Sequence, residues 1–178
     1  MFSIIINSLK KGLLTQPIAL PEVKLQELDH VGEELRRIIH SHYGRSLHIR
    51  EVDTGSCGAC ESEIAALNNP IYDIQRFGID FVASPRHADA LLITGAMSRN
   101  MVLALKKTYD AMPSPKFVIT VGQCASESSI FSASYYTSQE KIKEITGAPV
   151  LHIPGCPPGP KAMLIAILSF LEDQHSRR

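Results

Sequence analysis

Four cysteines are the residues of this sequence best suited to chemistry. Cys57 and Cys60 form a C-x-x-C pair, Cys124 and Cys156 stand alone further along the chain, and each has a glycine within two residues. Glycine lets the backbone come close to a bound group, and thiolates in tight turns are the ligands of iron–sulfur clusters and of structural zinc. The spacing therefore predicts a metal site built from all four thiols.

Three chemistries fit thiols in this pattern. A single 4Fe–4S cluster needs four thiolates from different directions, which one pair and two lone cysteines can supply. A structural zinc ion more often takes two C-x-x-C pairs, so a zinc-stapled binding module without a redox role is an alternative. A thioredoxin-like redox pair at Cys57 and Cys60 is the third interpretation, but it leaves Cys124 and Cys156 unexplained.

The elements that must position these thiols alternate between short apolar runs and helical patterns. We expect strands at Leu47–Val52, Ile79–Ala83, Ala90–Thr94, Lys116–Val121 and Val150–Ile153. We expect helices at Lys24–Tyr43, Glu61–Asn68, Asn100–Met112, Ser138–Ile145 and Pro160–Asp173. This alternation predicts an α/β sandwich of three layers around a mostly parallel sheet.

Each cysteine segment follows a predicted strand. The C-x-x-C pair follows the first strand, Cys124 the fourth and Cys156 the fifth. Because parallel strands end at the same carboxyl edge of a sheet, where such folds bind ligands, we expect the four thiols to meet there.

The chain divides into two expected parts, an N-terminal arm and amphipathic helix over residues 1–44 and an iron–sulfur-binding α/β domain over residues 45–178. The arm, residues 1–22, has apolar positions at helical spacing and could lie on a membrane surface or a partner, or could be an unordered terminus. We expect no secretory signal, because the charges follow the apolar start and no small-residue cleavage site is apparent. A cytoplasmic location, where thiols stay reduced, favours metal binding over disulfides.

Composition excludes several classes of function. Lys+Arg 18 against Asp+Glu 18 gives no net charge, so nothing in the charge balance favours a nucleic acid partner. No apolar run approaches the roughly 18 to 20 residues of a membrane-spanning helix. The sequence also lacks a Gly-x-Gly-x-x-Gly fingerprint, a phosphate loop and a G-x-S-x-G elbow.

Five ordered motifs resemble one family of redox subunits. They are Val52–Glu63, Ser84–Asp89, Thr94–Gly95, Gly122–Cys124 and Pro154–Pro158. Together they resemble the small subunit of membrane-associated, energy-converting NiFe hydrogenases, including those of formate hydrogenlyase type, and the homologous 20 kDa subunit of respiratory complex I. The resemblance covers roughly residues 45 to 172.

The resemblance implies a flavodoxin-like domain in which Cys57, Cys60, Cys124 and Cys156 hold one 4Fe–4S cluster. It implies an electron-transfer subunit that relays electrons between ferredoxin-type iron–sulfur subunits and a hydrogenase-like or complex I-like large subunit. The complex would include membrane subunits, which would keep this chain peripheral at the inner face of the cytoplasmic membrane. The C-x-x-C pair favours the hydrogenase branch, because complex I subunits carry adjacent cysteines; a complex I-like subunit that passes electrons to quinone is the alternative. Nickel would be bound by cysteines of the large subunit, so this chain alone should not turn over hydrogen.

Residues near the thiols carry weaker expectations. The resemblance places Glu63 near the partner interface, where it could carry protons; otherwise it is an acid in the first turn of a helix, as is Glu61. Arg86 and His87 occupy a turn that approaches the large subunit in the family, or a solvated loop. His152 lies four residues before Cys156 and could sense the cluster. The resemblance fails after Cys124, where serines replace the usual glycines, and again over residues 138–148.

Overall fold

The computed structural model describes residues 25–126, 129–138, 140, 142–148 and 150–176. The predicted arm of residues 1–22 lies outside the described residues. The helices and 3-10 turns are α2 (Leu25–Tyr43), α3 (Ala59–Ala66), η1 (Ile74–Phe77), η2 (Pro85–His87), α4 (Val102–Asp110), η3 (Gln123–Ala125), α5 (Ile142–Thr146) and α6 (Pro160–Ser176). The strands are β1 (Leu47–Asp53), β2 (Ile79–Phe81), β3 (Ala90–Thr94), β4 (Phe117–Val121) and β5 (Val150–Ile153).

The five strands form one sheet in the order β2-β1-β3-β4-β5, and all four strand pairs are parallel. This is the strand order of flavodoxin-like folds. Every residue of β3 and β4 is buried, and most are β-branched residues or leucine, as expected for strands that are covered on both faces. The predicted α/β fold class is therefore confirmed.

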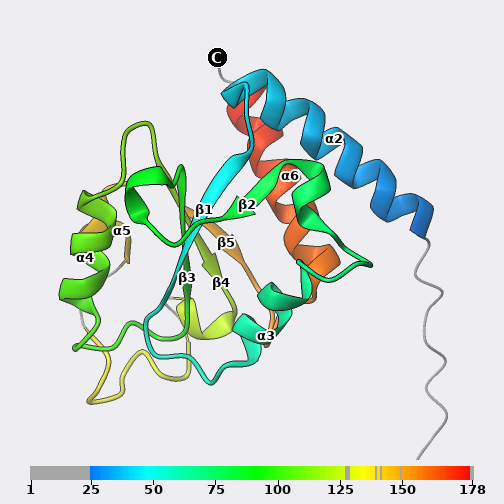
Figure 1. The fold of residues 1–178 in the computed structure, drawn as a ribbon. Coiled ribbons are helices and arrows are strands. Elements are labelled where there is room, and N and C mark those ends of the chain that lie inside the picture. The colour runs from blue at the N-terminus through cyan, green and yellow to red at the C-terminus, as the bar shows by residue number, and fades with distance from the viewer. Residues whose placement is uncertain (1–24, 127–128, 139, 141, 149, 177–178) are drawn as a thin grey trace, which may run out of the picture.

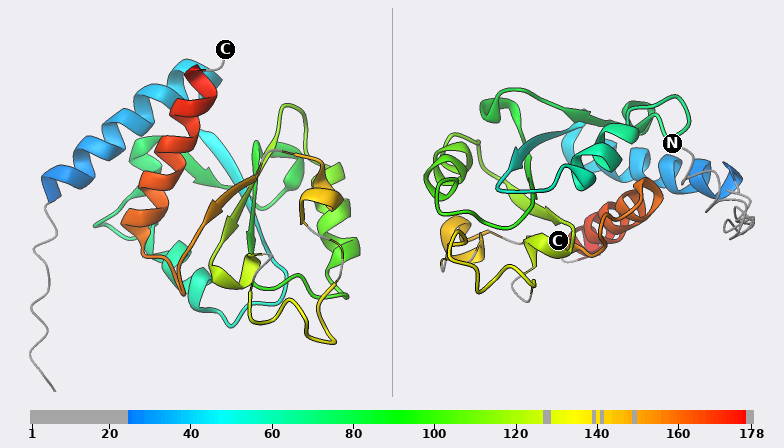
Figure 2. Two further views of the ribbon diagram at one scale, coloured as in Figure 1. Left: turned by 180° about the vertical axis from the view of Figure 1, so that it is seen from behind. Right: turned by 90° about the horizontal axis from the view of Figure 1, so that it is seen from below.

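Helices cover both faces of the sheet (Figures 1 and 2). On one face, α2, α3 and α6 share a core with alternate strand residues, in which Leu35 and Leu164 are fully buried. On the other face, α4 contributes Leu105 to a smaller core, and α5 packs Ile142 and Ile145 against it. In the described part of the chain, no helix is both long and apolar enough to cross a membrane.

Two helix boundaries differ from the sequence prediction in ways that affect the site. The third-layer helix predicted from Ser138 begins at Ile142 as α5, because Thr137 pairs with Ser98 and the Ser138 N–H donates to the Met97 carbonyl oxygen at 2.7 Å. The helix predicted from Glu61 begins earlier, at Ala59, so that Cys60 lies in its first turn.

Candidate metal centre

The first two cysteines leave the sheet through a turn that Asp53 organises. Asp53 Oδ1 at the end of β1 accepts hydrogen bonds from the N–H groups of Gly55 at 2.8 Å and Ser56 at 2.7 Å. This turn leaves Cys57 exposed, and α3 then carries Cys60 back to a buried position. The local sequence thus directs two thiols from one loop toward different surroundings.

Glycine is required where this turn meets the chain that follows β3. Gly95 has φ +76°, and a Cβ built on it would lie 2.3 Å from the Ser56 nitrogen. Any larger residue would push the Cys57 loop outward. The loop after β3 therefore supports the loop of the first cysteine, although it carries no cysteine of its own.

The loops of the other two cysteines are joined by backbone hydrogen bonds. The N–H of Gly122 donates to the Ile153 carbonyl oxygen at 2.9 Å, and that of Gln123 donates to the Gly155 carbonyl oxygen at 2.7 Å. Cys124 is half-buried in η3, whereas Cys156 is exposed directly after Gly155. The turns after β4 and β5 are consequently one connected structure.

All three loops meet at the carboxyl edge of the sheet, the lower edge in Figure 1. A Cβ built on Gly122, which has φ +91°, would lie 2.6 Å from Cys60 Sγ and 3.7 Å from the Gly155 carbonyl oxygen. Cys60 is 8% exposed and borders the larger core, yet its sulfur faces the loops of Cys124 and Cys156. We call this edge, with its four cysteines, the thiol edge.

The thiols at this edge influence one another electrostatically. Burial raises the pKa of Cys60 most, Glu61 and the other three thiols raise it further, and together they bring it to about 11. Burial, followed by the charges of Cys156 and Cys57, also raises the pKa of Cys124, which a backbone hydrogen bond partly opposes. Thiolates are therefore disfavoured here without a compensating positive charge, which bound iron or zinc ions supply.

The chemistry of the four thiols suits a cluster, but their side chains do not form a preformed site for a single metal ion. Within the described ranges, no three His, Cys, Asp or Glu side chains lie close enough together to hold one metal ion. A four-iron cubane is larger than one ion and separates its thiolates more widely. Because Gly122 has no Cβ, its backbone comes close to Cys60 Sγ, and such close approach is typical of the tight turns that surround iron–sulfur clusters.

Carboxylates lie behind the thiol edge, including one that the sequence reasoning missed. Glu63 is half-buried on α3, as is Glu61, whose two carboxylate oxygens are buried and find no hydrogen-bond partner among the described residues. Burial raises the pKa of Glu51 on β1, Glu61 and Asp53 raise it further, and Arg50 opposes the shift. The signal in the sequence was a pair of charged residues, Arg50 and Glu51, between the buried apolar positions Ile49 and Val52 of β1.

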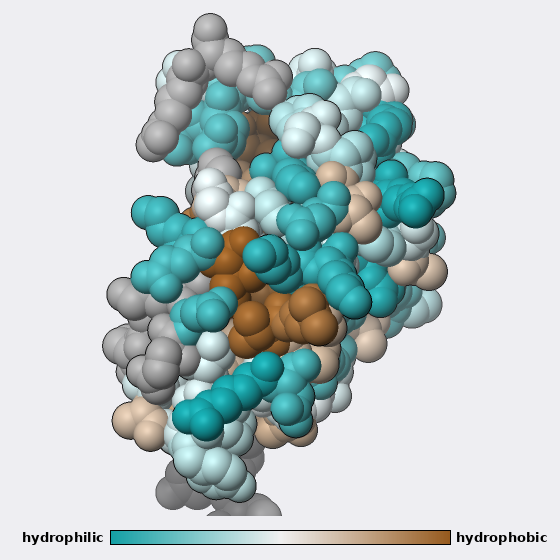
Figure 3. All heavy atoms as spheres, turned by 90° about the vertical axis from the view of Figure 1, so that its left-hand side faces the viewer, coloured by the Kyte–Doolittle hydropathy of each residue, from teal (hydrophilic) through white to brown (hydrophobic). Residues whose placement is uncertain are grey.

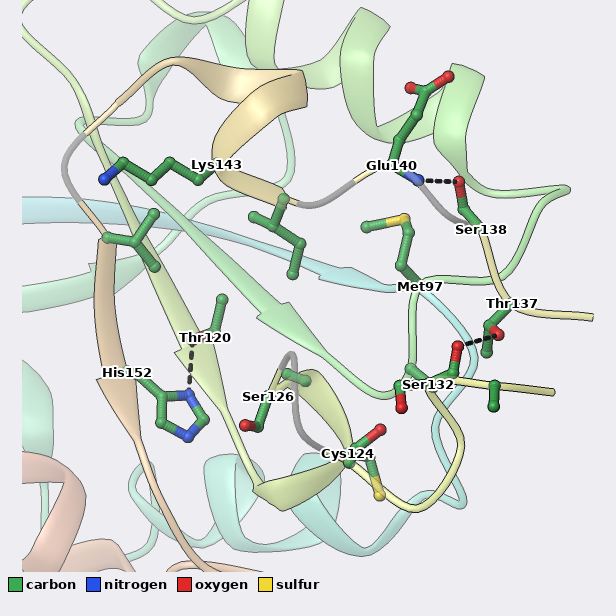
Figure 4. Close-up of a pocket in the computed structure, with 16 residues that line it drawn as sticks. Met97, Thr120, Cys124, Ser126, Ser132, Thr137, Ser138, Glu140, Lys143 and His152 are labelled. Carbon is green, nitrogen blue, oxygen red and sulfur yellow. Dashed lines mark hydrogen bonds between the residues drawn. The ribbon is translucent and has the colours of Figure 1, made fainter.

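His152 lies on β5, beside a cavity of about 830 Å³ that also borders Cys124 (Figure 4). Its Nδ1 is 2.9 Å from Thr120 Oγ1, and burial lowers its pKa. Lys143 and Glu140 line the same cavity, but their charged ends lie at opposite sides of it (Figure 4). The cavity therefore connects His152 to the thiol edge, but the two charged side chains that line it do not converge on one point.

Arg86 and His87 lie at the opposite edge of the sheet. The His87 carbonyl oxygen is 3.1 Å from Nδ1 of His48, at the start of β1, and η2 leads directly into the start of β3. The structure thus separates this turn from the four thiols.

Comparison with known proteins gives a consistent family. Residues 57–170 match the family model described as NADH ubiquinone oxidoreductase, 20 Kd subunit. A probable membrane-bound hydrogenase subunit of Pyrococcus furiosus is 42% identical over 72% of this chain and 76% of its own length. Formate hydrogenlyase subunit 7 of Escherichia coli is 40% identical over 75% of this chain, which spans only 53% of that relative.

A solved structure extends the likeness to three dimensions. A chain of the membrane-bound sulfane sulfur reductase, an archaeal respiratory membrane complex, superposes with a TM-score of 0.58 and 27% identity. The match covers 84% of this chain and 75% of that chain. The likeness thus spans nearly the whole α/β domain.

Proposed function

This chain belongs to the NADH ubiquinone oxidoreductase, 20 Kd subunit family, and from that membership we propose that it relays electrons through one 4Fe–4S cluster held by Cys57, Cys60, Cys124 and Cys156. Its relatives are subunits of hydrogenase, formate hydrogenlyase and NADH-quinone oxidoreductase complexes, so the chain is a subunit of an oxidoreductase complex. The C-x-x-C pair supports the hydrogenase-like branch. The observation that supports the proposal is the meeting of three cysteine loops around Gly122, where an added Cβ would lie 2.6 Å from Cys60 Sγ and 3.7 Å from the Gly155 carbonyl oxygen.

The four cysteines hold different sides of the site, according to how deeply each is buried. Cys60 and Cys124 hold the inner side of the site, where the raised pKa of each thiol means that metal binding must displace a proton. Cys57 and Cys156 are exposed and close the outer side. A bound cluster supplies a one-electron couple, and burial and backbone N–H groups set its potential.

The exposed thiols lie where we propose that the large subunit docks. A large subunit on the thiol edge would exclude water from Cys57 and Cys156 and bring its own redox centre close to the cluster. The cluster would exchange electrons with ferredoxin-type subunits, and membrane subunits would hold the assembly at the inner face of the cytoplasmic membrane. Glu61 lies close enough to Cys60 for its charge to raise the pKa of that thiol. Glu63, on the same helix, is the proposed proton-carrying carboxylate near the partner interface.

The ligand assignment is tested with a single substitution. We expect the anaerobically purified chain to be brown, with broad absorption near about 400 nm, whereas a zinc protein is colourless. Cys124→Ser should remove or convert the cluster, and the EPR spectrum of the reduced protein should disappear or change. Ser132→Ala, an exposed hydroxyl in the following loop, is the matched control. Full iron content and an unchanged spectrum in Cys124→Ser would refute the assignment.

A further inference from the structure

Residues 129–138, which we call the anchor loop, have the composition of a protein interface. The segment contains Phe131, Tyr135, Tyr136 and Ile130 but no charged residue. The centres of protein–protein interfaces are depleted in charge and enriched in aromatic side chains. The composition therefore distinguishes this loop from an ordinary solvated connection.

Two side chains of the anchor loop are exposed to an unusual degree. Ile130 is 91% exposed and Tyr135 is 85% exposed, the highest fractions among the large hydrophobic residues exposed in the described ranges. Single exposed hydrophobic residues are common on protein surfaces, but two within six residues of one uncharged loop are not explained by that background.

Hydrogen bonds hold the anchor loop in one shape. The Thr137 hydroxyl is buried and lies within hydrogen-bond distance of the carbonyl oxygens of Phe131, Ser132 and Ser134, at 3.1, 3.3 and 2.7 Å. Arg99 donates from its backbone N–H to the Tyr136 carbonyl oxygen at 2.9 Å and from Nε to the Thr137 carbonyl oxygen at 3.1 Å. The exposed side chains are thus presented by a preorganised loop, which lowers the entropy cost of docking.

The anchor loop is continuous with the thiol edge. It rests on residues 97–99 through the Ser98–Thr137 bridge and the Ser138–Met97 hydrogen bond. The N–H of Ser98 in turn donates to the Thr54 carbonyl oxygen at 2.9 Å, in the loop that carries Cys57. In Figures 1 and 2, the loop extends the same edge of the sheet beneath α4. A subunit that covers the exposed thiols therefore meets the anchor loop on the same surface.

We propose that the anchor loop is the docking site of the large subunit, with Ile130 and Tyr135 as its two anchors. The inference rests on the proposed function, because that function requires a large subunit at the thiol edge. The partner surface must offer apolar pockets and no uncompensated charge opposite the loop. Figure 3 shows an apolar area on the side of the molecule that carries α4 and α5. Leu103 on α4 is 61% exposed and lies outside the anchor loop, which makes it a matched control.

The test uses the full chain, tagged and expressed in its own complex. Ile130→Asp and Tyr135→Asp should each lower recovery of the large subunit, identified by mass spectrometry, by at least about tenfold. Leu103→Asp, an equivalent change on α4, should leave that recovery unchanged. Absorption near about 400 nm should be the same in all three variants, because none of them alters a thiol.

A photo-crosslinking amino acid at position 135 gives a readout that does not depend on loss of binding. It should crosslink to the large subunit, whereas the same group at position 103 should not. The inference is overturned if both loop variants retain the large subunit, or if Leu103→Asp releases it equally. A wild-type chain that binds the large subunit through the loop but contains no iron would refute the cluster and leave the docking site standing.

Discussion

Polar groups are arranged differently at the two ends of the sheet, the amino edge where the strands begin and the thiol edge where they end. At the amino edge, Asp89 is almost fully buried, and both of its carboxylate oxygens accept hydrogen bonds from Arg45, at 2.8 and 2.9 Å, while the backbone N–H of His48 adds a third at 3.0 Å. At the thiol edge, the buried carboxylate oxygens of Glu61 have no partner within the described residues. The first edge is stabilised by its polar groups, whereas the second keeps groups available for something that binds there.

The difference shows which edge supports the fold and which supports the function. Lys116, near the amino edge, donates to the carbonyl oxygens of Tyr109 and Met112 and lies over the Tyr109 ring. It therefore completes the C-terminal end of α4. Cysteines with raised pKa values contribute nothing comparable to the folded chain. Substitutions at the two edges should accordingly separate stability from metal content.

Removing the buried carboxylate should produce the largest change in stability. Asp89→Ala leaves Arg45 and the His48 N–H without their acceptor, and we expect a loss of about 3 kcal/mol in the free energy of unfolding, since Arg45 is half-exposed and can regain water. Denaturant titration measures the loss. Iron content per folded chain should not change; a parallel loss of iron would contradict the separation of the two edges.

The thiol edge should instead make the metal-free chain sensitive to alkaline pH. The folded pKa of Cys60, about 11, lies above the ordinary thiol value of 9.0, so the unfolded chain loses its proton first as pH rises. Stability is therefore fully present below about pH 9 and should fall by about 2 to 3 kcal/mol between about pH 9 and pH 11. Denaturation of the chain at a series of pH values checks the slope, with Cys60→Ala as the control. An equal slope in Cys60→Ala would assign the effect to other groups.

Two glycine-to-alanine substitutions compare the cost of adding a Cβ at the thiol edge with its cost elsewhere in the chain. Gly122→Ala places a Cβ 2.6 Å from Cys60 Sγ at φ +91°, whereas Gly44→Ala, at φ +63°, meets nothing within 4 Å. We expect costs of about 2 kcal/mol and about 1 kcal/mol respectively. Only Gly122→Ala should also lower iron content, because it displaces a thiol. Equal iron content in both variants would show that the approach to Cys60 is not required.

The smallest effect should come from an exposed ion pair. Arg76 Nη2 lies 2.8 Å from Asp29 Oδ1, but both side chains are about half exposed. Asp29→Ala should therefore change the free energy of unfolding by less than about 1 kcal/mol, measured under the same conditions as Asp89→Ala. A change as large as that of Asp89→Ala would mean that burial does not explain the strength of the amino edge.

Much of this arrangement follows from local sequence pattern. The β-branched runs predicted all five strands to within two residues, and the rule that parallel strands end at one edge predicted where the cysteine segments would lie. The late start of α5 was not predicted, because Ser138 is held by a hydrogen bond to Met97, which is distant in the chain. The early start of α3 depends on a local feature that the apolar pattern does not reveal, the left-handed backbone of its N-cap Gly58 at φ +86°.

Pairings between residues distant in the chain could not be predicted from the sequence either. Arg45 and Asp89 are 44 positions apart, and no periodicity connects them. Likewise, no sequence pattern connects Glu51 with Glu61, whose charge raises the pKa of Glu51 in the folded chain. The turn of Arg86 and His87 lies at the amino edge, opposite the thiols, and its predicted approach to a large subunit stays a prediction.

The most direct test of the account is the iron and acid-labile sulfide content of the anaerobically purified full chain, combined with EPR of its reduced form. The account predicts about four iron and four sulfide per chain and a single paramagnetic centre that integrates to about one spin. One zinc ion per chain with neither iron nor sulfide would contradict it and would make the thiol edge a structural staple.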